Sequence, residues 1–197
     1  LVGHDSYPLI AASRIHSLGD LAGTFSEELM DGRFELHYYR PVLNLSLALD
    51  EWLSGLDPRG YQRSNLLWFI ASALALYALV DRLSGEDRRA ALLAAVVYLL
   101  NVVHCVVLPV VSRRPETLCT LFLALSLRAQ IGATRSGRRS LAPAAFALLA
   151  MGSKESGFLA IPLVVLAAAA YRPRTTLSPW LRALTRDVAP MLVAGAV

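Results

Sequence analysis

Charge is scarce in this 197-residue chain. Charged residues make up 17% of it and hydrophobic residues 55%, whereas about a quarter of an average soluble domain is charged. Cysteine is also scarce, and because Cys105 and Cys119 both lie in apolar runs, the sequence predicts neither a disulfide framework nor a metal-binding spacing. Lysine occurs once, as Lys154, so the net charge of +4 is carried almost entirely by arginine. These arginines lie in loops between apolar runs, which argues against nucleic-acid binding and for orientation in a membrane.

Uncharged runs take up most of the second two thirds of the chain. Residues 90–111 contain no charge, and a helix of that length spans about 30 Å of hydrocarbon. Residues 66–80 become a full span with their flanks. Three shorter runs, which have to be tilted, half-buried or re-entrant, cover residues 117–127, 140–152 and 156–171. The sequence therefore predicts an all-α, polytopic transmembrane helical bundle over residues 64–197, with short or re-entrant helices.

The distribution of arginine gives the predicted loops an orientation. Residues 128–139 hold four Arg and no acid, whereas the turns at 112–116 and 152–156 each carry one Glu beside their basic residues. By the positive-inside rule the Arg-rich loops are cytoplasmic, namely residues 81–89, 128–139 and 171–187. The turns at 112–116 and 152–156 then share the outer face with residues 1–63. One long helix over 140–171 is the alternative, but it would hold Lys154 and Glu155 in mid-bilayer at a cost of about 2.5–3.5 kcal/mol each.

Residues 1–63 carry a net charge of −4 and are predicted to form an extracytoplasmic loop with interfacial helices. Thr24 and Glu27 fit a capping box at the start of one helix. Pro41 can open a second helix through Val42–Leu53, with Trp52 at the level of the lipid headgroups. The alternation of leucine with polar residues over 43–47 also fits a strand.

The two ends of the chain suggest part of a larger protein. It begins at Leu1 without a signal-peptide pattern and stops inside the apolar run 188–197. We therefore expect an interior piece of a multi-pass protein of the bacterial inner membrane or the endoplasmic reticulum membrane, truncated at both ends.

Three polar clusters converge on the predicted outer face. They are Tyr39-Arg40-Pro41, Ser112–Glu116 and Ser153-Lys154-Glu155. Fixed positive charge stabilises the negative charge that develops on a phosphate leaving group, and arginine binds phosphate through paired donors. The clusters therefore predict a site for a lipid-carried, phosphate-bearing substrate, with phosphate-binding candidates Arg40, Arg113, Arg114 and Lys154.

The order of these motifs resembles the GT-C superfamily of membrane glycosyltransferases. The nearest likeness is to protein O-mannosyltransferase-like enzymes with transmembrane and tetratricopeptide-repeat parts, and to their bacterial relatives. The resemblance covers most of residues 1–171. Positions that match the family pattern are Asp5, Tyr39, Arg40, Pro41, Tyr61, Asn65, His104, Ser112, Arg114, Glu116, Ser153, Lys154 and Glu155. Positions that depart from it are His4, Gln62, Asn101, Val102, Val106 and Arg113.

The resemblance implies an inverting glycosyltransferase. Its donor is a polyprenyl phosphate-linked sugar, and its acceptor is a hydroxyl group of a protein or glycan at the extracytoplasmic face. Asp5 is the leading candidate for the general base and Glu116 is the second acid. The supporting residues are Tyr39, Asn65, His104 and Glu155. No cofactor is predicted, and the sequence leaves a divalent metal open although the residues present do not support one.

Other interpretations of the same residues remain open. The departures at Asn101 and Val106 favour a degenerate, non-catalytic scaffold that keeps the GT-C-like fold. A transporter of lipid-linked intermediates would be expected to show internal pseudo-symmetry, and the sequence contains no repeat. Singly, Arg113 and Arg114 fit an interfacial cap, and His104 fits a hydrogen-bonded residue between helices.

Overall fold

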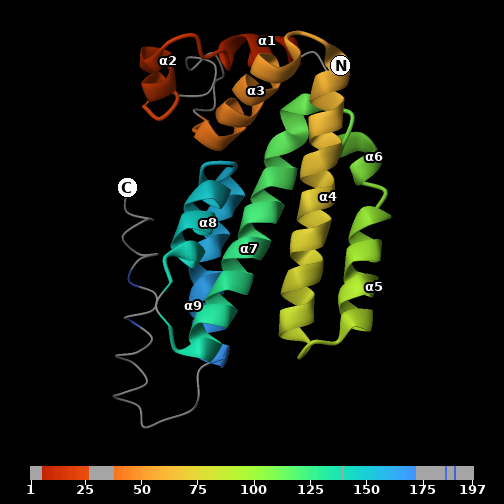
Figure 1. Ribbon diagram of the computed structural model, residues 1–197, viewed down its shortest axis with the longest axis vertical. Coiled ribbons are helices and arrows are strands. Elements are labelled where there is room, and N and C mark those ends of the chain that lie inside the picture. The colour runs from red at the N-terminus through yellow and green to blue at the C-terminus, as the bar shows by residue number, and fades with distance from the viewer. Residues whose placement is uncertain (1–5, 27–37, 139, 172–184, 186–188, 190–197) are drawn as a thin grey trace.

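The computed structural model describes residues 6–26, 38–138 and 140–171, together with residues 185 and 189 (Figure 1). Every regular element within these residues is helical, which confirms the all-α class. The first elements are α1 (Ser6–Ala12), α2 (Leu18–Gly23), α3 (Pro41–Ser54), α4 (Pro58–Leu83), α5 (Arg88–Leu99) and α6 (His104–Val107). The remaining elements are η2 (Val111–Arg113), α7 (Arg114–Ser136), α8 (Ala142–Met151), η3 (Glu155–Leu159) and α9 (Ala160–Tyr171).

Two helical segments are long and apolar enough to cross a membrane, judged by length and composition. They are α4, with 26 residues, and the continuous segment Val111–Ser136, also with 26. Only 28% of the most apolar window of α4 is buried inside the protein, so most of this helix presents apolar surface outward. The large exposed side chains on α4 and α5 are Leu66, Leu67, Ile70, Leu74, Leu92, Leu93, Val96 and Val97.

The uncharged run at 90–111 does not form the single span that its length predicts. Helix α5 ends at Leu99, and its 12 residues reach only about 18 Å at 1.5 Å per residue. Asn101 follows, and its side-chain Oδ1 accepts a hydrogen bond from the backbone N–H of Val103 (3.0 Å). The chain then turns into the short helix α6. The side chain of Asn101 therefore satisfies a backbone donor of the turn at which the apolar run is interrupted.

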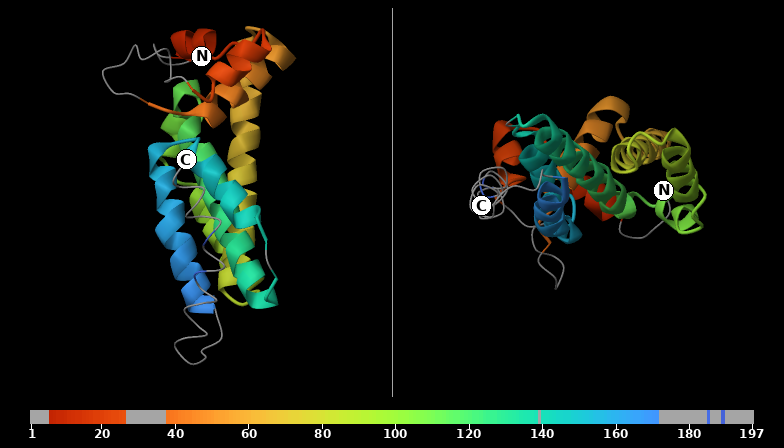
Figure 2. Two further views of the ribbon diagram at one scale, coloured as in Figure 1. Left: turned by 90° about the vertical axis from the view of Figure 1, so that its left-hand side faces the viewer. Right: turned by 90° about the horizontal axis from the view of Figure 1, so that it is seen from below.

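Helix α7 lies between two groups of helices, α4 with α5 on one side and α8 with α9 on the other (Figures 1 and 2). The contact between α4 and α7 is made by small and branched residues, including Ala75 and Leu79 of α4 and Ala124 and Ile131 of α7. The α8–α9 core is built mainly from alanines, which allow the helices to approach closely. Ser126 Oγ on α7 also donates to the carbonyl of Pro143 on α8 (2.8 Å).

The turns between the long helices fall at two opposite ends. The α4–α5 turn and the α7–α8 turn lie at one end, while the α8–η3 turn and the start of α7 lie at the other (Figure 1). Lys154 is therefore at the apex between two short helices, as predicted, and the alternative of one long helix over 140–171 is wrong. Residues 81–89 lie at the first end, as does the end of α7. The predicted short run 117–127 and the loop 128–139 are wrong in their bounds, because α7 continues through them to Ser136. Apart from Tyr171 and residue 185, the predicted loop 171–187 lies outside the described residues.

Helix α3 lies across the second end, and with α1 it covers the tops of the long helices (Figures 1 and 2). It begins at Pro41, as predicted, so the strand interpretation of 43–47 is wrong. The helix that the predicted capping box of Thr24 and Glu27 would open lies outside the described residues, within which Thr24 ends α2 and the capping box of α2 is formed by Ser17 and Asp20. Glu27 lies outside the described residues.

Candidate functional site

Arg40 and Glu155 form a two-pronged ion pair between the start of α3 and the start of η3. Arg40 Nε donates to Glu155 Oε1 (2.9 Å), and Nη2 donates to Oε2 (2.8 Å). The guanidinium also lies over the ring of Tyr38, 4.4 Å from its centroid. Paired charge-assisted bonds of this kind fix the orientation of both groups as well as their distance. They join residues 115 positions apart in the sequence.

Lys154 and Glu116 form a second ion pair beside the first. Lys154 Nζ donates to Glu116 Oε1, which links the α8–η3 turn to the first turn of α7. Arg40, Glu116, Lys154 and Glu155, which we call the charge cluster, therefore come from three separate parts of the chain. The prediction that these three polar clusters converge at one end of the helices is confirmed.

Backbone contacts hold the charge cluster together. The N–H of Val42 donates to the carbonyl of Gly152 (3.0 Å), which joins α3 directly to the α8–η3 turn. Gly152 lies so close to α3 that an added Cβ would come within 3.0 Å of a Val42 methyl group. Ser153 is fully buried and donates from Oγ to the carbonyl of Leu149 (2.6 Å). The turn that carries Lys154 and Glu155 is therefore fixed on both sides.

The local charges lower the pKa of the Glu155 carboxyl group. Partial burial by itself raises this pKa, but the hydrogen bonds and charge of Arg40, with the charge of Lys154, outweigh the burial and hold the pKa below its ordinary range. The folded protein therefore binds a proton at Glu155 less readily than the unfolded chain does.

This shift predicts an acid-sensitive contact. The contribution of Glu155 to stability is complete above the ordinary Glu pKa of about 4.3 and is lost as pH falls through its lower value in the folded protein. Its size is at most about 1 kcal/mol, because solvent screens a carboxylate that is 47% exposed. The carboxyl ¹³C shift of Glu155, followed through an acid titration, should show a midpoint below the ordinary value. In Arg40→Met the midpoint should rise, and equal midpoints in the two proteins would show that Arg40 is not the cause.

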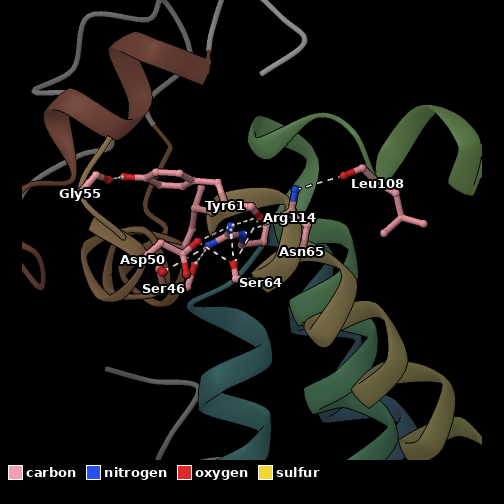
Figure 3. Close-up of polar contacts among 9 residues, drawn as sticks. Ser46, Asp50, Gly55, Tyr61, Ser64, Asn65, Leu108 and Arg114 are labelled. Carbon is pink, nitrogen blue, oxygen red and sulfur yellow. Dashed lines mark hydrogen bonds and ion pairs between the residues drawn. The ribbon is translucent and has the colours of Figure 1, made fainter. Parts of the chain in front are cut away.

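Arg114 lies in a second, buried polar network beneath α3 (Figure 3). Its Nη2 bonds to Asp50 Oδ2 (2.6 Å) and to Ser64 Oγ (2.8 Å). Nη2 also lies 3.4 Å from the carbonyl of Tyr61, Nε donates to Asn65 Oδ1 (2.7 Å), and Nη1 donates to the carbonyl and hydroxyl of Ser46. The Arg114 network therefore joins α3, α4 and α7 at one point.

The position of Arg114 favours a structural role over the predicted phosphate contact. Its side chain has no exposed surface, that of Asp50 is 5% exposed, and each nitrogen of the guanidinium already has a protein partner. A buried charge needs such complete pairing, because an unpaired charge is costly away from water. Arg113, the preceding residue, is exposed and forms no ion pair within the described part of the chain.

Sequence reasoning missed Asp50 and Ser64. The helical pattern of α3 places Asp50 on the side opposite Trp52, and the sequence names no partner for its carboxylate. Leu43, Ser46, Leu47 and Asp50 instead form the buried side of α3, while Trp52 is 81% exposed. The available signal was that Asp50 follows Ser46 by four residues, on the same side of the helix. The partner of Asp50, Arg114, lies 64 positions away in the sequence.

The other predicted site residues lie around these two groups. Asn65 bonds to Arg114 and also donates from Nδ2 to the carbonyl of Leu108 (3.1 Å). Tyr39 donates to the carbonyl of Phe25 (2.9 Å) and does not contact the charge cluster through a hydrogen bond. His104 stacks on Phe69 and on Tyr98, each with ring centroids 4.6 Å apart, and its buried Nδ1 has no hydrogen-bond partner among the described residues. The predicted base Asp5 lies outside the described residues.

The predicted residues thus separate into two groups. Arg40, Glu116, Lys154 and Glu155 meet at a partly exposed surface, whereas Arg114 and Asn65 meet inside the protein. Within the described ranges, no group of three or more His, Cys, Asp or Glu side chains is arranged to hold a metal ion. No family model, curated protein or solved structure matches this chain.

Proposed function

We propose that this chain is part of a membrane glycosyltransferase of the GT-C type. It moves a sugar from a polyprenyl phosphate carrier to a hydroxyl acceptor, such as a protein serine or threonine. The observation that carries the proposal is the meeting of Arg40 and Lys154, two cations from distant segments, at one end of two apolar helices of membrane-spanning length. Such a pair of cations is suited to the phosphate of a lipid-linked donor.

In this proposal the chain spans the membrane several times, and the charge cluster faces the extracytoplasmic side. The Arg-rich loops at the opposite end support this orientation. Helix α3 then lies at the interface, where the exposed side chains of Leu49, Trp52 and Leu53 meet lipid. The outward leucines of α4 support contact with hydrocarbon, because a monomeric protein in water rarely exposes so large an apolar surface.

The proposed reaction is a displacement at the anomeric carbon of the sugar. The acceptor oxygen forms a bond to this carbon on the face opposite the phosphate, and the carbon–oxygen bond to the phosphate breaks with its electron pair moving to the phosphate oxygen. The phosphate charge changes from −1 in the diester donor to about −2 in the released monoester. Arg40 and Lys154 stabilise that added charge. The acceptor proton passes to Asp5, the base that the family resemblance implies, and Glu116 is the second candidate.

The experiment measures sugar transfer from a panel of labelled polyprenyl phosphate sugars, with the full chain in membranes. Turnover that collapses in Asp5→Asn, while lipid binding persists, supports an enzyme with Asp5 as base. Equal turnover in both proteins removes Asp5 from that role and directs attention to Glu116. Binding of the lipid phosphate without turnover by the wild type supports the non-catalytic scaffold.

Loss of the lysine charge should reduce transfer strongly. We expect Lys154→Met to lower kcat/KM by about 10²-fold, the usual effect of removing one group that stabilises developing negative charge. Arg59→Met is the matched control, because Arg59 is an exposed cation at the same end of the protein. Equal losses in the two variants would indicate a general effect of surface charge and would contradict the role of Lys154.

A further inference from the structure

The two cations of the charge cluster are less exposed than the carboxylates that bind them. The side chain of Arg40 is 15% exposed and that of its partner Glu155 is 47% exposed. The side chain of Lys154 is 26% exposed and that of Glu116 is 46% exposed. The acidic groups therefore form an outer layer over the basic groups.

An exposed carboxylate can separate from its cation without disturbing the packing beneath it. Rotation of the Glu155 or Glu116 side chain exchanges one exposed ion pair for hydration, and exposed pairs contribute little to stability. The cations need not move, because Arg40 is supported by the Tyr38 ring and Lys154 by the fixed α8–η3 turn. Asp50 provides the contrast, since at 5% exposure it has no path to water and remains on Arg114.

A phosphate monoester is a stronger ligand for these cations than a carboxylate. It carries about two negative charges and three acceptor oxygens, whereas each glutamate carries one charge. A phosphodiester carries only one charge and so has little advantage over the carboxylate that it must displace. The outcome of this competition depends on the charge of the incoming phosphate.

We propose that Glu155 and Glu116 are internal competitors for the phosphate site, which occupy its two cations until a phosphate displaces them. This inference rests on the proposed function, in which the donor is a diester and the leaving group becomes a monoester. Because either ligand must displace the same carboxylates, the glutamates weaken binding of the diester donor and of the monoester product by a similar factor. Glu155 acts only through Arg40 in this scheme, whereas Glu116, the second candidate for the base, also acts through Lys154.

The test is binding of farnesyl phosphate and of its methyl diester to the full chain in detergent micelles, with inorganic phosphate as a lipid-free probe. Glu155→Gln should bind the diester about two- to fivefold more tightly than the wild type, which is the fold-change that an exposed ion pair provides. Binding of farnesyl phosphate should tighten by at least the same factor, because the monoester displaces the same carboxylate. Glu116→Gln should act in the same direction through Lys154, which guards against a local rearrangement in either variant alone. Glu51→Gln is the matched control, because Glu51 on α3 pairs with Arg14 (2.8 Å) outside the charge cluster.

Unchanged or weaker diester binding in both glutamine variants would overturn the inference, provided that their thermal unfolding matches the wild type. Tightening in Glu51→Gln as well would also overturn it, because net charge alone would then be the cause. Inorganic phosphate separates the possible sources of the anion, since equal tightening for phosphate and for farnesyl phosphate assigns the competition to the headgroup chemistry. If the glutamine variants bind phosphate more tightly but no protein transfers sugar, the anion site is supported and the proposed enzyme is rejected. If sugar is transferred but the donor KM of Glu155→Gln equals that of the wild type, the enzyme is supported and the competition by Glu155 is rejected.

Discussion

Replacing Arg114 with methionine is expected to destabilise the protein by about 3–5 kcal/mol. The substitution removes one partner of a buried ion pair and leaves the Asp50 carboxylate without its charge partner, 5% exposed. The hydroxyl of Ser64 and the side chain of Asn65 also lose their bonds to the guanidinium. The free energy of unfolding in detergent micelles, measured by denaturant titration, provides the test.

A double-mutant cycle identifies the cause of this loss. Asp50→Leu alone should also be costly, because it leaves the Arg114 charge buried. The double variant Arg114→Met/Asp50→Leu should lose less than the sum of the two single variants, since two apolar side chains replace the pair. Additive losses would indicate that Asp50 and Arg114 are not coupled.

The ion pair between Arg14 and Glu51 gives a matched comparison, because Glu51 lies on α3 beside Asp50. Its side chains are 37% and 19% exposed, so Arg14→Met should cost no more than about 1 kcal/mol. A similar cost for Arg14→Met and Arg114→Met would mean that burial does not set the strength of these pairs. The sugar-transfer assay adds a second distinction, because a structural Arg114 should lower the amount of folded protein without changing the KM of the fraction that remains folded.

Much of the helical arrangement follows from local sequence patterns. Pro41 fixes the start of α3 because its ring suits the first helical position, where an N–H is not needed. Lys154 and Glu155 interrupt an apolar stretch, and the high cost of charged groups within hydrocarbon correctly predicts that the chain turns there. The same reasoning brought Arg40, Glu116 and Lys154 to one end of the helices, and the structure confirms this convergence.

The features that the sequence did not reveal depend on contacts between distant residues or on a single polar side chain. The leucine pattern of α3 is compatible with two faces, and the deciding partner of Asp50 is Arg114, which lies on α7. The composition of the run at 90–111 is uniformly apolar and predicts one span, yet α5 ends at Leu99 and Asn101 binds the backbone of the turn that follows. Composition therefore located the apolar segments better than it located their ends.

Replacing Gly157 with alanine is expected to disrupt the turn that carries Lys154 and Glu155. A Cβ at position 157 would lie 2.2 Å from the carbonyl oxygen of Ala150 and 2.5 Å from the backbone nitrogen of Met151. These are backbone atoms at the end of α8, and they cannot rotate away as a side chain can. Helix η3 would have to move as a unit, so we expect a loss of about 3 kcal/mol or more in the free energy of unfolding.

Gly137→Ala separates this clash from the general cost of removing a glycine. Gly137 has a φ of 65° with nothing within 4 Å of an added Cβ, so its replacement should cost only about 1–2 kcal/mol through backbone strain. Gly137 also follows α7 at the end opposite the charge cluster, so the low pKa of Glu155 should persist in Gly137→Ala. In Gly157→Ala that pKa should rise toward its ordinary value, because displacement of η3 separates Glu155 from Arg40. If Gly157→Ala loses no more stability than Gly137→Ala and keeps the low pKa of Glu155, then the close contact between η3 and α8 does not hold the ion pair in place, and the Val42–Gly152 bond remains the link that does.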